Sequence, residues 1–417
     1  LTLDRARNTL STGERQRVQL ARAVRNETTG VLYVLDEPSI GLHPSNIDGL
    51  MNVVDSLIAD GNSVVLVDHD VRVLKQADHM IELGPLAGTQ GGTVLAQGSM
   101  KEILAAGAYK IAPFLTDTGH MKIRRRAKAA EVFRLGTIRM ETCPIHTVHA
   151  LNVVIPKGRL TAVTGVSGSG KTTLVLESLI PGLAAHCAGE KLPFPVKTVE
   201  AEGIRRANLI DASPIGINIR STVATYSGIL DELRKLYAGM EVAKAGKLKA
   251  GDFSYNTGSL RCPVCDGTGQ ISLDVQFLPD VTITCPECNG KRYSGEAEKI
   301  LWKPKTAEKA FSLPELMAMT VDDTLELFKD KKKIYEKLKV LHDLGLGYLT
   351  LGEDTPALSG GEAQRLKLAS EMGRTQEDSV FVFDEPTIGL HPLDVKVLLG
   401  VFDHLVEAGA TVLVIEH

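Results

Sequence analysis

The stretch Gly165–Thr172 has residue types and spacing that can bind a nucleotide phosphate. It follows the pattern G-x-x-x-x-G-K-T, in which the glycines let backbone N–H groups point at a phosphate. Lys171 can reach the β- and γ-phosphates, and the Thr172 hydroxyl can be a ligand for Mg²⁺. The alternative is a flexible glycine turn with an incidental lysine, but an expected strand before the loop and helix after it disfavour that. We predict that ATP or ADP binds at Gly165, Val166, Ser167, Gly168, Ser169, Gly170, Lys171, Thr172 and Thr173.

Four cysteines have the spacing of a structural zinc site. They form two C-x-x-C pairs with 19 residues between the pairs (285 − 265 − 1). Glycines follow the cysteines, as needed for a turn that points backbone N–H groups at sulfur. Four thiolates complete a tetrahedron around Zn²⁺ and leave no place for a catalytic water, and thiol redox chemistry is the alternative. The predicted zinc ligands are Cys262, Cys265, Cys285 and Cys288.

Acidic residues follow two apolar stretches that we expect to be strands. In each Asp-Glu pair the aspartate can hold Mg²⁺, and the glutamate can polarise an attacking water. A histidine closes the next expected strand, where an imidazole can donate a hydrogen bond to a γ-phosphate. A lone histidine there would more often be structural, but this one recurs at the same spacing from Asp-Glu. The predicted catalytic residues are Glu37, His69, Glu385 and His417, and the predicted Mg²⁺ ligands are Asp36, Thr172 and Asp384.

An internal repeat with one constant offset accounts for this recurrence. Asp36 matches Asp384 (384 − 36 = 348), and His69 matches His417 (417 − 69 = 348). Each copy has the order helix, apolar strand, helix, second apolar strand, so the chain contains two copies of one α/β unit. The expected strands lie at 31–35, 63–67, 160–164, 380–383 and 411–415.

A serine-glycine loop recurs at the same offset. Leu358–Glu362 resembles the signature of ATP-binding cassette (ABC) ATPases, and Leu10–Glu14 is its first copy, with Thr12 in place of a glycine. The hydroxyl and N–H groups of such a loop lie at a helix N-terminus, which favours a phosphate. Two copies in one chain predict a head-to-tail sandwich in which the first signature completes the site at 165–172. The residues of these loops that we predict to bind nucleotide are Ser11, Gly13, Ser359, Gly360 and Gly361.

The length of the second copy requires an insertion. Between Thr172 and Ser359 lie 186 residues (359 − 172 − 1), far more than a minimal P-loop domain needs. We predict an α/β fold of the P-loop ABC-type ATPase class, with tandem nucleotide-binding units and a zinc-bearing α+β insertion. The expected domains are the C-terminal half of the first unit at 1–99, a linker at 100–131, and the second unit at 132–417 with its insertion at about 200–357.

The composition is that of an ordinary globular protein, with 43% hydrophobic and 24% charged residues in 417. The net charge of −4 gives no reason by itself to expect nucleic-acid binding, which would need local basic patches. No apolar run approaches the ~18 residues of a membrane span and no signal peptide is visible, so we expect a cytoplasmic protein without a membrane partner. The chain starts at Leu1 rather than Met, and we expect a fragment of a longer protein.

Basic residues occur at two places where a phosphate could be contacted. Arg261, Lys291 and Arg292 flank the cysteines with Tyr293 beside them, and basic plus aromatic side chains suit nucleic acid. Ordinary surface solubility explains these residues equally well. The run Lys122–Lys128 is expected to be a solvated face, with a phosphate-contacting patch as the alternative.

Several stretches together resemble one protein family over nearly the whole chain. They include Val163–Lys171, Arg220–Tyr226, Phe253–Asn256, Phe277–Val281, Gly290–Tyr293 and Leu346–Tyr348, and Asp-Glu-Pro-(Ser/Thr)-Ile-Gly-Leu-His occurs twice. These stretches are similar to UvrA, the A-subunit family of the bacterial excinuclease. Transporter cassettes lack a zinc module between P-loop and signature, so the resemblance is specific.

The resemblance implies a homodimeric, DNA-binding ATPase that recognises distorted or damaged duplex DNA in nucleotide excision repair. It implies nucleotide and Mg²⁺ at Lys171, Thr172, Asp384 and Glu385, and a UvrB-type repair subunit as a partner whose docking module is not in this stretch. Double-stranded DNA would then be the phosphate partner of the basic residues beside the cysteines. The alternative is a UvrA-like ABC ATPase with a role in drug resistance or another process outside repair and transport.

Two departures from the family pattern concern ATP hydrolysis. The family carries a glutamine before Ser213–Gly216 that helps to bind Mg²⁺ and the water, and here the residues are Asp211 and Ala212. An alanine side chain offers neither a carbonyl nor an amide donor. Together with Thr12, this predicts slow hydrolysis at the second site, in a divergent UvrA-like paralogue.

Overall fold

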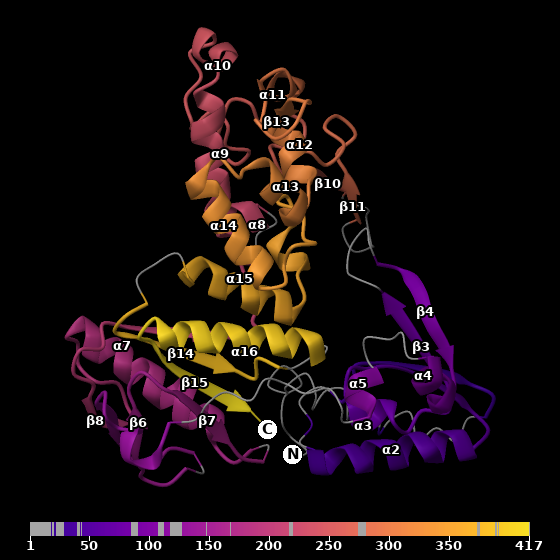
Figure 1. The fold of residues 1–417 in the computed structure, drawn as a ribbon, viewed down its shortest axis with the longest axis vertical. Coiled ribbons are helices and arrows are strands. Elements are labelled where there is room, and N and C mark those ends of the chain that lie inside the picture. The colour runs from indigo at the N-terminus through magenta and orange to yellow at the C-terminus, as the bar shows by residue number, and fades with distance from the viewer. Residues whose placement is uncertain are drawn as a thin grey trace. The chain divides into compact units, whose positions relative to one another are not determined.

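The computed structural model divides the chain into two compact units, Leu1–Ala212 with Gln376–His417, and Ser213–Thr375. Figure 1 shows their helices and strands. The structure describes residues 18, 21, 29–39, 42, 44–84, 91–106, 112–116, 127–146, 148–166, 168–216, 220–273, 281–372, 376–387, 390 and 392–416.

A four-stranded parallel sheet organises the first unit (Figure 1). Its order is β7-β15-β14-β9, so the last two strands of the chain lie between two strands that precede the second unit in sequence. The first five residues of β14 and of β15 are all buried, which explains why these strands are almost entirely apolar. The strand bounds are β7 Leu160–Thr164, β9 Arg206–Ile210, β14 Ser379–Asp384 and β15 Thr411–Glu416.

Different elements cover the two faces of this sheet. Val382 and Leu413 belong to a core cluster with Leu183 of helix α7. An antiparallel sheet of order β6-β5-β8 contributes to the same cluster. Because side chains alternate along a strand, Phe383 points the other way, and its ring lies 4.7 Å from that of Phe402 on α16. The bounds are β5 Thr137–Thr142, β6 Asn152–Pro156, β8 Val196–Glu200, α6 Lys171–Leu174, η4 Val175–Leu179, α7 Ile180–Ala188 and α16 Pro392–Glu407, with the short η3 at Ala129–Glu131.

The first copy of the repeat has the same elements at the same offset. Helix α2 (Pro44–Ala59) matches α16 at both ends (392 − 44 = 348 and 407 − 59 = 348), and β1 pairs with β2 as β14 pairs with β15. The structure therefore confirms the repeat. Of the helix expected at 14–24 the structure describes only residues 18 and 21, and both are helical. The further bounds are β1 Leu32–Asp36, β2 Ser63–Val67, α3 Val71–Leu74, β3 Met80–Gly84, β4 Thr93–Gly98, α4 Met100–Ala106 and α5 Ala112–Leu115.

The regular elements of the second unit are mostly helices, with two short antiparallel β-pairs, β10–β11 and β12–β13. The helical spacing of Thr324–Leu344 is divided between α13 and α14, because the fully buried Phe328 leaves the helix and stacks on Trp302 at 4.4 Å. The bounds are α8 Val223–Tyr226, α9 Ile229–Ala238, α10 Glu241–Ala245, β10 Gln270–Leu273, β11 Val281–Thr284, α11 Gly295–Glu298, β12 Leu301–Trp302, β13 Phe311–Ser312, α12 Leu313–Ala318, α13 Val321–Leu327, α14 Lys332–Asp343, η5 Thr355–Ala357 and α15 Gly360–Met372.

Replacing Leu413 with Ala should destabilise the first unit by about 3 kcal/mol, because it removes a fully buried side chain from the middle of β15. Leu83→Ala on β3 is the matched control, since that side chain is 66% exposed and should cost less than about 0.5 kcal/mol. Urea unfolding followed by circular dichroism measures both. Equal midpoints for the two variants would contradict the central position assigned to β15.

Candidate functional site

The carboxyl ends of the parallel strands bring the predicted nucleotide residues to one edge of the sheet. β7 leads into the P-loop at Gly165, and β14 ends at Asp384. β15, which lies between them, ends at Glu416, and β9 on the far side of β14 ends at Ile210. Ligands of open α/β sheets bind at this edge. The sheet therefore supplies the arrangement that the P-loop and Asp-Glu patterns predicted.

The P-loop backbone needs its glycines. Gly168 and Gly170 have positive φ angles of 81° and 94°. A Cβ atom on Gly170 would lie 2.4 Å from Cγ2 of Val148, so a larger residue would collide as well as strain the backbone. Lys171 is 8% exposed, and its Nζ donates to the Gly165 carbonyl oxygen at 2.5 Å. The ammonium thus lies inside the loop, where a phosphate would meet it. Ser167 lies outside the described residues.

The two glutamates predicted to act on water share an unusual backbone conformation. Glu37 has φ 46° and Glu385 has φ 47°, which is the left-handed region that non-glycine residues rarely adopt. In each copy the glutamate N–H donates to the neighbouring strand, to Val67 O at 2.7 Å and to Ile415 O at 3.0 Å. The strand pairing thus holds the strained conformation, and both glutamates leave the sheet edge in the same way.

In the first copy the structure brings the predicted glutamate and histidine together. His69 Nε2 lies 3.3 Å from Glu37 Oε1. Burial raises the pKa of Glu37, and the carboxylates of Asp36 and Asp68 raise it further, while His69 acts against them. A raised pKa suits a group that takes a proton from water. His417, the second-copy equivalent, lies outside the described residues.

Sequence reasoning missed an acidic residue that organises this edge in each copy. Asp68 accepts hydrogen bonds from the Ser39 N–H at 3.1 Å and the Ser39 hydroxyl at 2.7 Å. Glu416 does the same for the Thr387 N–H at 3.1 Å. These bonds tie the segment after Asp-Glu to the next strand. The signal was available, since both residues are acidic and obey the offset (416 − 68 = 348).

The second signature opens α15 with reciprocal hydrogen bonds. The Ser359 N–H donates to Glu362 Oε2 at 2.7 Å, and the Glu362 N–H donates to the Ser359 hydroxyl at 3.3 Å. This is a capping box, which fixes the helix start and leaves the glycine N–H groups at the end of the helix. Ser359 and Gly360 are exposed. The first signature, including Ser11, Thr12 and Gly13, lies outside the described residues.

The four predicted zinc ligands form one buried cluster in the second unit. All four Sγ atoms lie within 4.8 Å of one another, with Cys262–Cys285 at 3.9 Å and Cys265–Cys288 at 3.7 Å. These distances are too long for a disulfide of about 2.05 Å. They match the ~3.8 Å edge of a tetrahedron with Zn–S bonds of about 2.3 Å. The cluster fits the zinc site predicted from the spacing.

The turns around the cysteines also fit a metal. A Cβ atom on Gly267 would lie 1.7 Å from the Tyr255 carbonyl oxygen, so this knuckle accepts only glycine. The Gly269 N–H donates to Cys265 Sγ at 3.3 Å. Burial acts to raise the pKa of Cys265, but the Gly269 N–H and the neighbouring thiols lower it to about 7. Burial raises the pKa of Cys288 to about 12. A metal ion would stabilise all four thiolates together.

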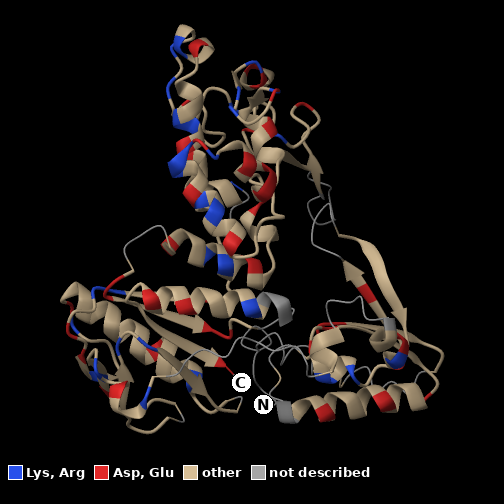
Figure 2. Ribbon diagram, viewed as in Figure 1, with Lys and Arg blue, Asp and Glu red and all other residues tan. Residues whose placement is uncertain are grey.

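The basic residues beside the cysteines are paired with carboxylates. Arg261 Nε lies 2.5 Å from Asp266, and Lys291 Nζ lies 2.7 Å from Glu298. Both remain partly exposed, with side chains 38% and 45% accessible. Over the whole unit, Lys and Arg are interspersed with Asp and Glu (Figure 2). The linker run at 122–126 lies outside the described residues.

The expectation that Arg292 and Tyr293 form part of a basic and aromatic surface for nucleic acid is wrong. The Arg292 side chain is 7% exposed and pairs with the Asp354 carboxylate. Tyr293 is 3% exposed, and its hydroxyl donates to the Phe253 carbonyl oxygen at 2.9 Å. Both side chains point inward because φ of Arg292 is positive, at 69°, which turns the chain after the second knuckle. Neither side chain is presented to a nucleic acid.

Comparison with known proteins supports one family. The chain is 42% identical over 421 residues to UvrABC system protein A of Aquifex aeolicus and 41% identical over 423 residues to that of Thermus thermophilus. Each match covers 100% of this chain. The chain belongs to the UvrA family.

The structural comparison agrees with this family and with the predicted fold class. The crystal structure of UvrA2 from Deinococcus radiodurans superposes with a TM-score of 0.89 at 38% identity, covering 100% of this chain and 49% of that one. No family model matches the chain. The chain spans less than half the length of its UvrA relatives, at 44% and 43%. Among the described helices, none has the length and apolar character to cross a membrane.

The purified protein should contain one Zn²⁺ for each Cys262–Cys288 module, and Cys285→Ser should lose it, because three thiolates cannot close the tetrahedron. Cys143→Ser is the matched control, since Cys143 lies outside the cluster. Metal analysis by mass spectrometry checks both variants. Wild-type protein without zinc, or a disulfide between these cysteines, would refute the assignment.

Proposed function

We propose that this chain is part of a UvrA-type ABC ATPase that binds duplex DNA and recognises distorted or damaged sites in nucleotide excision repair. The observation that carries the proposal is 42% identity to UvrABC system protein A over the whole chain. A P-loop and an Asp-Glu pair at one sheet edge support the ATPase part. The cysteine module in the second unit supports membership of a DNA-handling family rather than a transporter.

The nucleotide roles follow from the positions of the side chains. Lys171 would exchange its bond to the Gly165 carbonyl for the phosphates, and the P-loop N–H groups would hold their oxygens. Thr172 and Asp384 would hold Mg²⁺, which neutralises developing charge on the phosphates when it is bound. Glu385 would orient water and accept its proton, and His417 would hydrogen-bond the γ-phosphate. In the other nucleotide site Asp36, Glu37 and His69 would have these roles.

The signatures would complete both sites. Ser359, Gly360 and Gly361 present a hydroxyl and N–H groups at the start of α15, which suits a γ-phosphate. Ser11 and Gly13 would do the same for the nucleotide held at 165–172. In this arrangement each signature binds the nucleotide held by the P-loop of the other copy. Closure of the two copies onto each other would then depend on ATP.

The remaining parts of the proposal concern partners. Arg261 and Lys291 are the partly exposed basic residues of the zinc module, and we propose that they exchange their carboxylate partners for DNA phosphate. Arg292 is excluded from this role by its burial. A homodimer, a UvrB-type repair subunit as partner and a cytoplasmic location belong to the same proposal.

One observation favours a second candidate function, a UvrA-like ATPase in drug resistance or another role outside repair. Ala212 follows β9, which is the neighbour of the Asp384 strand, and its methyl group replaces the expected amide at the nucleotide edge. A site that binds ATP but turns it over slowly would suit a nucleotide-gated clamp on DNA better than repeated cycles of damage search.

Wild-type full-length protein should bind a duplex with one bulky thymine adduct more tightly than the unmodified duplex, in a manner that depends on ATP. Lys171→Ala should lose this dependence, because ATP affinity of the second site falls about 10- to 100-fold without the charged contact. Fluorescence anisotropy measures DNA binding, and Lys197→Ala, an exposed lysine of β8, is the control. No preference for the adduct in the wild type would refute damage recognition.

Ala212→Gln should raise ATP turnover at the second site by up to about 10²-fold, since it restores a group that positions Mg²⁺ and water. Ala212→Leu adds a side chain of similar size without an amide and should leave turnover unchanged. Phosphate release is measured in the full-length protein with the other P-loop inactivated. If the wild type already matches the Gln variant, the slow-site hypothesis is wrong.

A further inference from the structure

Arg292 links the two turns of the cysteine module. Its carbonyl oxygen accepts the Cys262 N–H at 2.9 Å, and its Nη1 donates to the Gly267 carbonyl oxygen at 3.3 Å. The guanidinium carbon lies 5.2 Å from the centre of the Tyr255 ring, within cation–π range. One side chain therefore touches the first knuckle while its own backbone follows the second.

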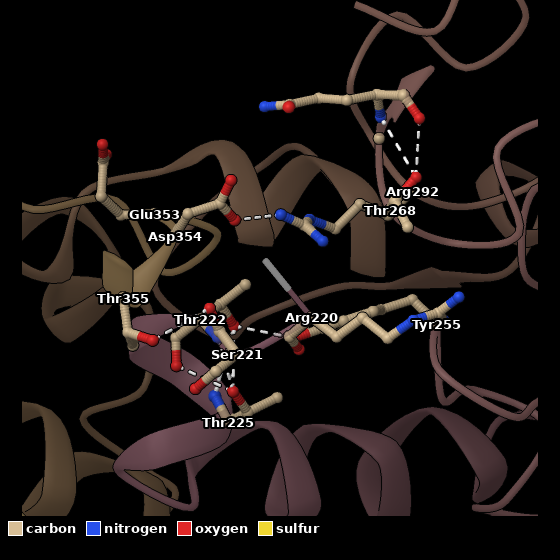
Figure 3. Close-up of polar contacts among 12 residues, drawn as sticks. Arg220, Ser221, Thr222, Thr225, Tyr255, Thr268, Arg292, Glu353, Asp354 and Thr355 are labelled. Carbon is tan, nitrogen blue, oxygen red and sulfur yellow. Dashed lines mark hydrogen bonds and ion pairs between the residues drawn. The ribbon is translucent and has the colours of Figure 1, made fainter. Parts of the chain in front are cut away.

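The Nη2 atom of this guanidinium reaches out of the module to the Asp354 carboxylate (Figure 3). The two side chains are 7% and 19% exposed, so water screens their attraction poorly. Burial raises the pKa of Asp354, and Arg292 acts against that rise. The pair is thus a directional, charge-assisted contact between the cysteine module and the segment at 353–355.

Asp354 is held firmly on its other side. It forms an isolated β-bridge with Thr222, and the Thr355 N–H donates to the Ser221 carbonyl oxygen at 3.0 Å. The Thr355 hydroxyl donates to Ile215 O at 2.8 Å. Because these bonds hold Asp354 to its neighbours, a movement of Arg292 would displace the whole backbone segment at 353–355 and not the Asp354 side chain alone.

From Asp354 to the signature serine the route is short. The Ala357 N–H donates to Asp354 O at 3.0 Å, which closes the turn η5. Ser359 follows five residues after Asp354 (359 − 354 = 5) and caps α15 through Glu362, whose carboxylate also contacts the Tyr348 hydroxyl. The hydrogen bonds of the turn and the cap constrain the backbone between Asp354 and Ser359.

A cavity of about 360 Å³ lies beside the pair. Thr268 and Gly290 of the cysteine module line one side, and Gly352 and Glu353 line the other. The two segments are therefore not packed continuously here, and the ion pair bridges them across open space. Arg220, which binds Asp266 of the first knuckle at 2.9 Å, is a second connection on the other segment, and the Arg292–Asp354 pair is the one that leads directly to the backbone before Ser359.

We propose that Arg292 and Asp354 form a positioning pair through which the cysteine module, on engaging DNA, sets the position of the signature serine Ser359. This inference rests on the proposed function, because it assumes that the module meets DNA and that Ser359 serves a nucleotide site. Neither side chain touches nucleotide or DNA in this scheme. Their effect is to make ATP turnover respond to DNA.

The test uses the full-length protein with Arg292→Gln, Asp354→Asn and the double variant. The control is Arg234→Gln on α9, which removes an ion pair with Asp231 that lies within one helix of the same unit. ATP turnover is measured with and without saturating adduct-bearing duplex, together with DNA affinity and zinc content. Hydrogen–deuterium exchange of the peptide 353–362 is followed with and without DNA.

We expect the effect of DNA on ATP turnover to be about 10-fold smaller in each pair variant than in the wild type. The DNA-dependent change in hydrogen–deuterium exchange at 353–362 should also be lost. Zinc content, DNA affinity and turnover without DNA should match the wild type, and the double variant should resemble the single ones. The control should retain the DNA effect.

Three results would overturn the inference. If the pair variants respond to DNA as the wild type does, the pair does not couple the two sites. If both Arg292→Gln and Asp354→Asn lose zinc, the pair is structural only. If the wild type binds no DNA or its turnover ignores DNA, the proposed function fails and the inference fails with it.

Discussion

The nucleotide edge of this protein depends on the hydrogen-bonded pairing of β15 with β7 and β14. β15 is the last strand in the sequence, yet it separates the P-loop strand from the Asp384 strand. Ile415 pairs with both Val163 and Asp384, so the register sets the level at which the P-loop and the acidic pair leave the sheet. A slip of one residue would exchange the side chains between the two buried faces of β15 and shift the P-loop relative to Asp384. The apolar core therefore fixes the geometry of the polar site.

Three side chains of the candidate site and the cysteine module are placed by a left-handed backbone. Glu37, Glu385 and Arg292 all have positive φ, and in each a backbone hydrogen bond to a neighbouring segment holds the conformation. The glutamates bond to the adjacent strand, and the Arg292 carbonyl bonds to Cys262 of the other knuckle. Strain of this kind persists only where surrounding structure compensates it. The rigid sheet and the cysteine cluster provide that compensation.

The types and spacing of residues close together in the sequence were enough to predict much of the fold and of the candidate site. A P-loop and a C-x-x-C pair are contiguous motifs, and the turn geometry they need is encoded by glycines within a few residues. The constant offset of 348 predicted two similar units, and the elements of both copies obey it. Strands at 160–164 and 411–415 followed from short apolar runs. Each of these predictions needed only neighbours along the chain.

Tertiary structure alone decided which side chains face one another. The sequence placed Arg292 beside the cysteines, but only folding turned it inward to Asp354, 62 residues away. It also paired Asp68 with Ser39 and placed β9, the strand that precedes Ala212, beside the Asp384 strand. The physical reason is that strand order and side-chain direction depend on long-range pairing and burial. Residue types and spacing determined the chemistry that is possible, while packing determined which residues carry it.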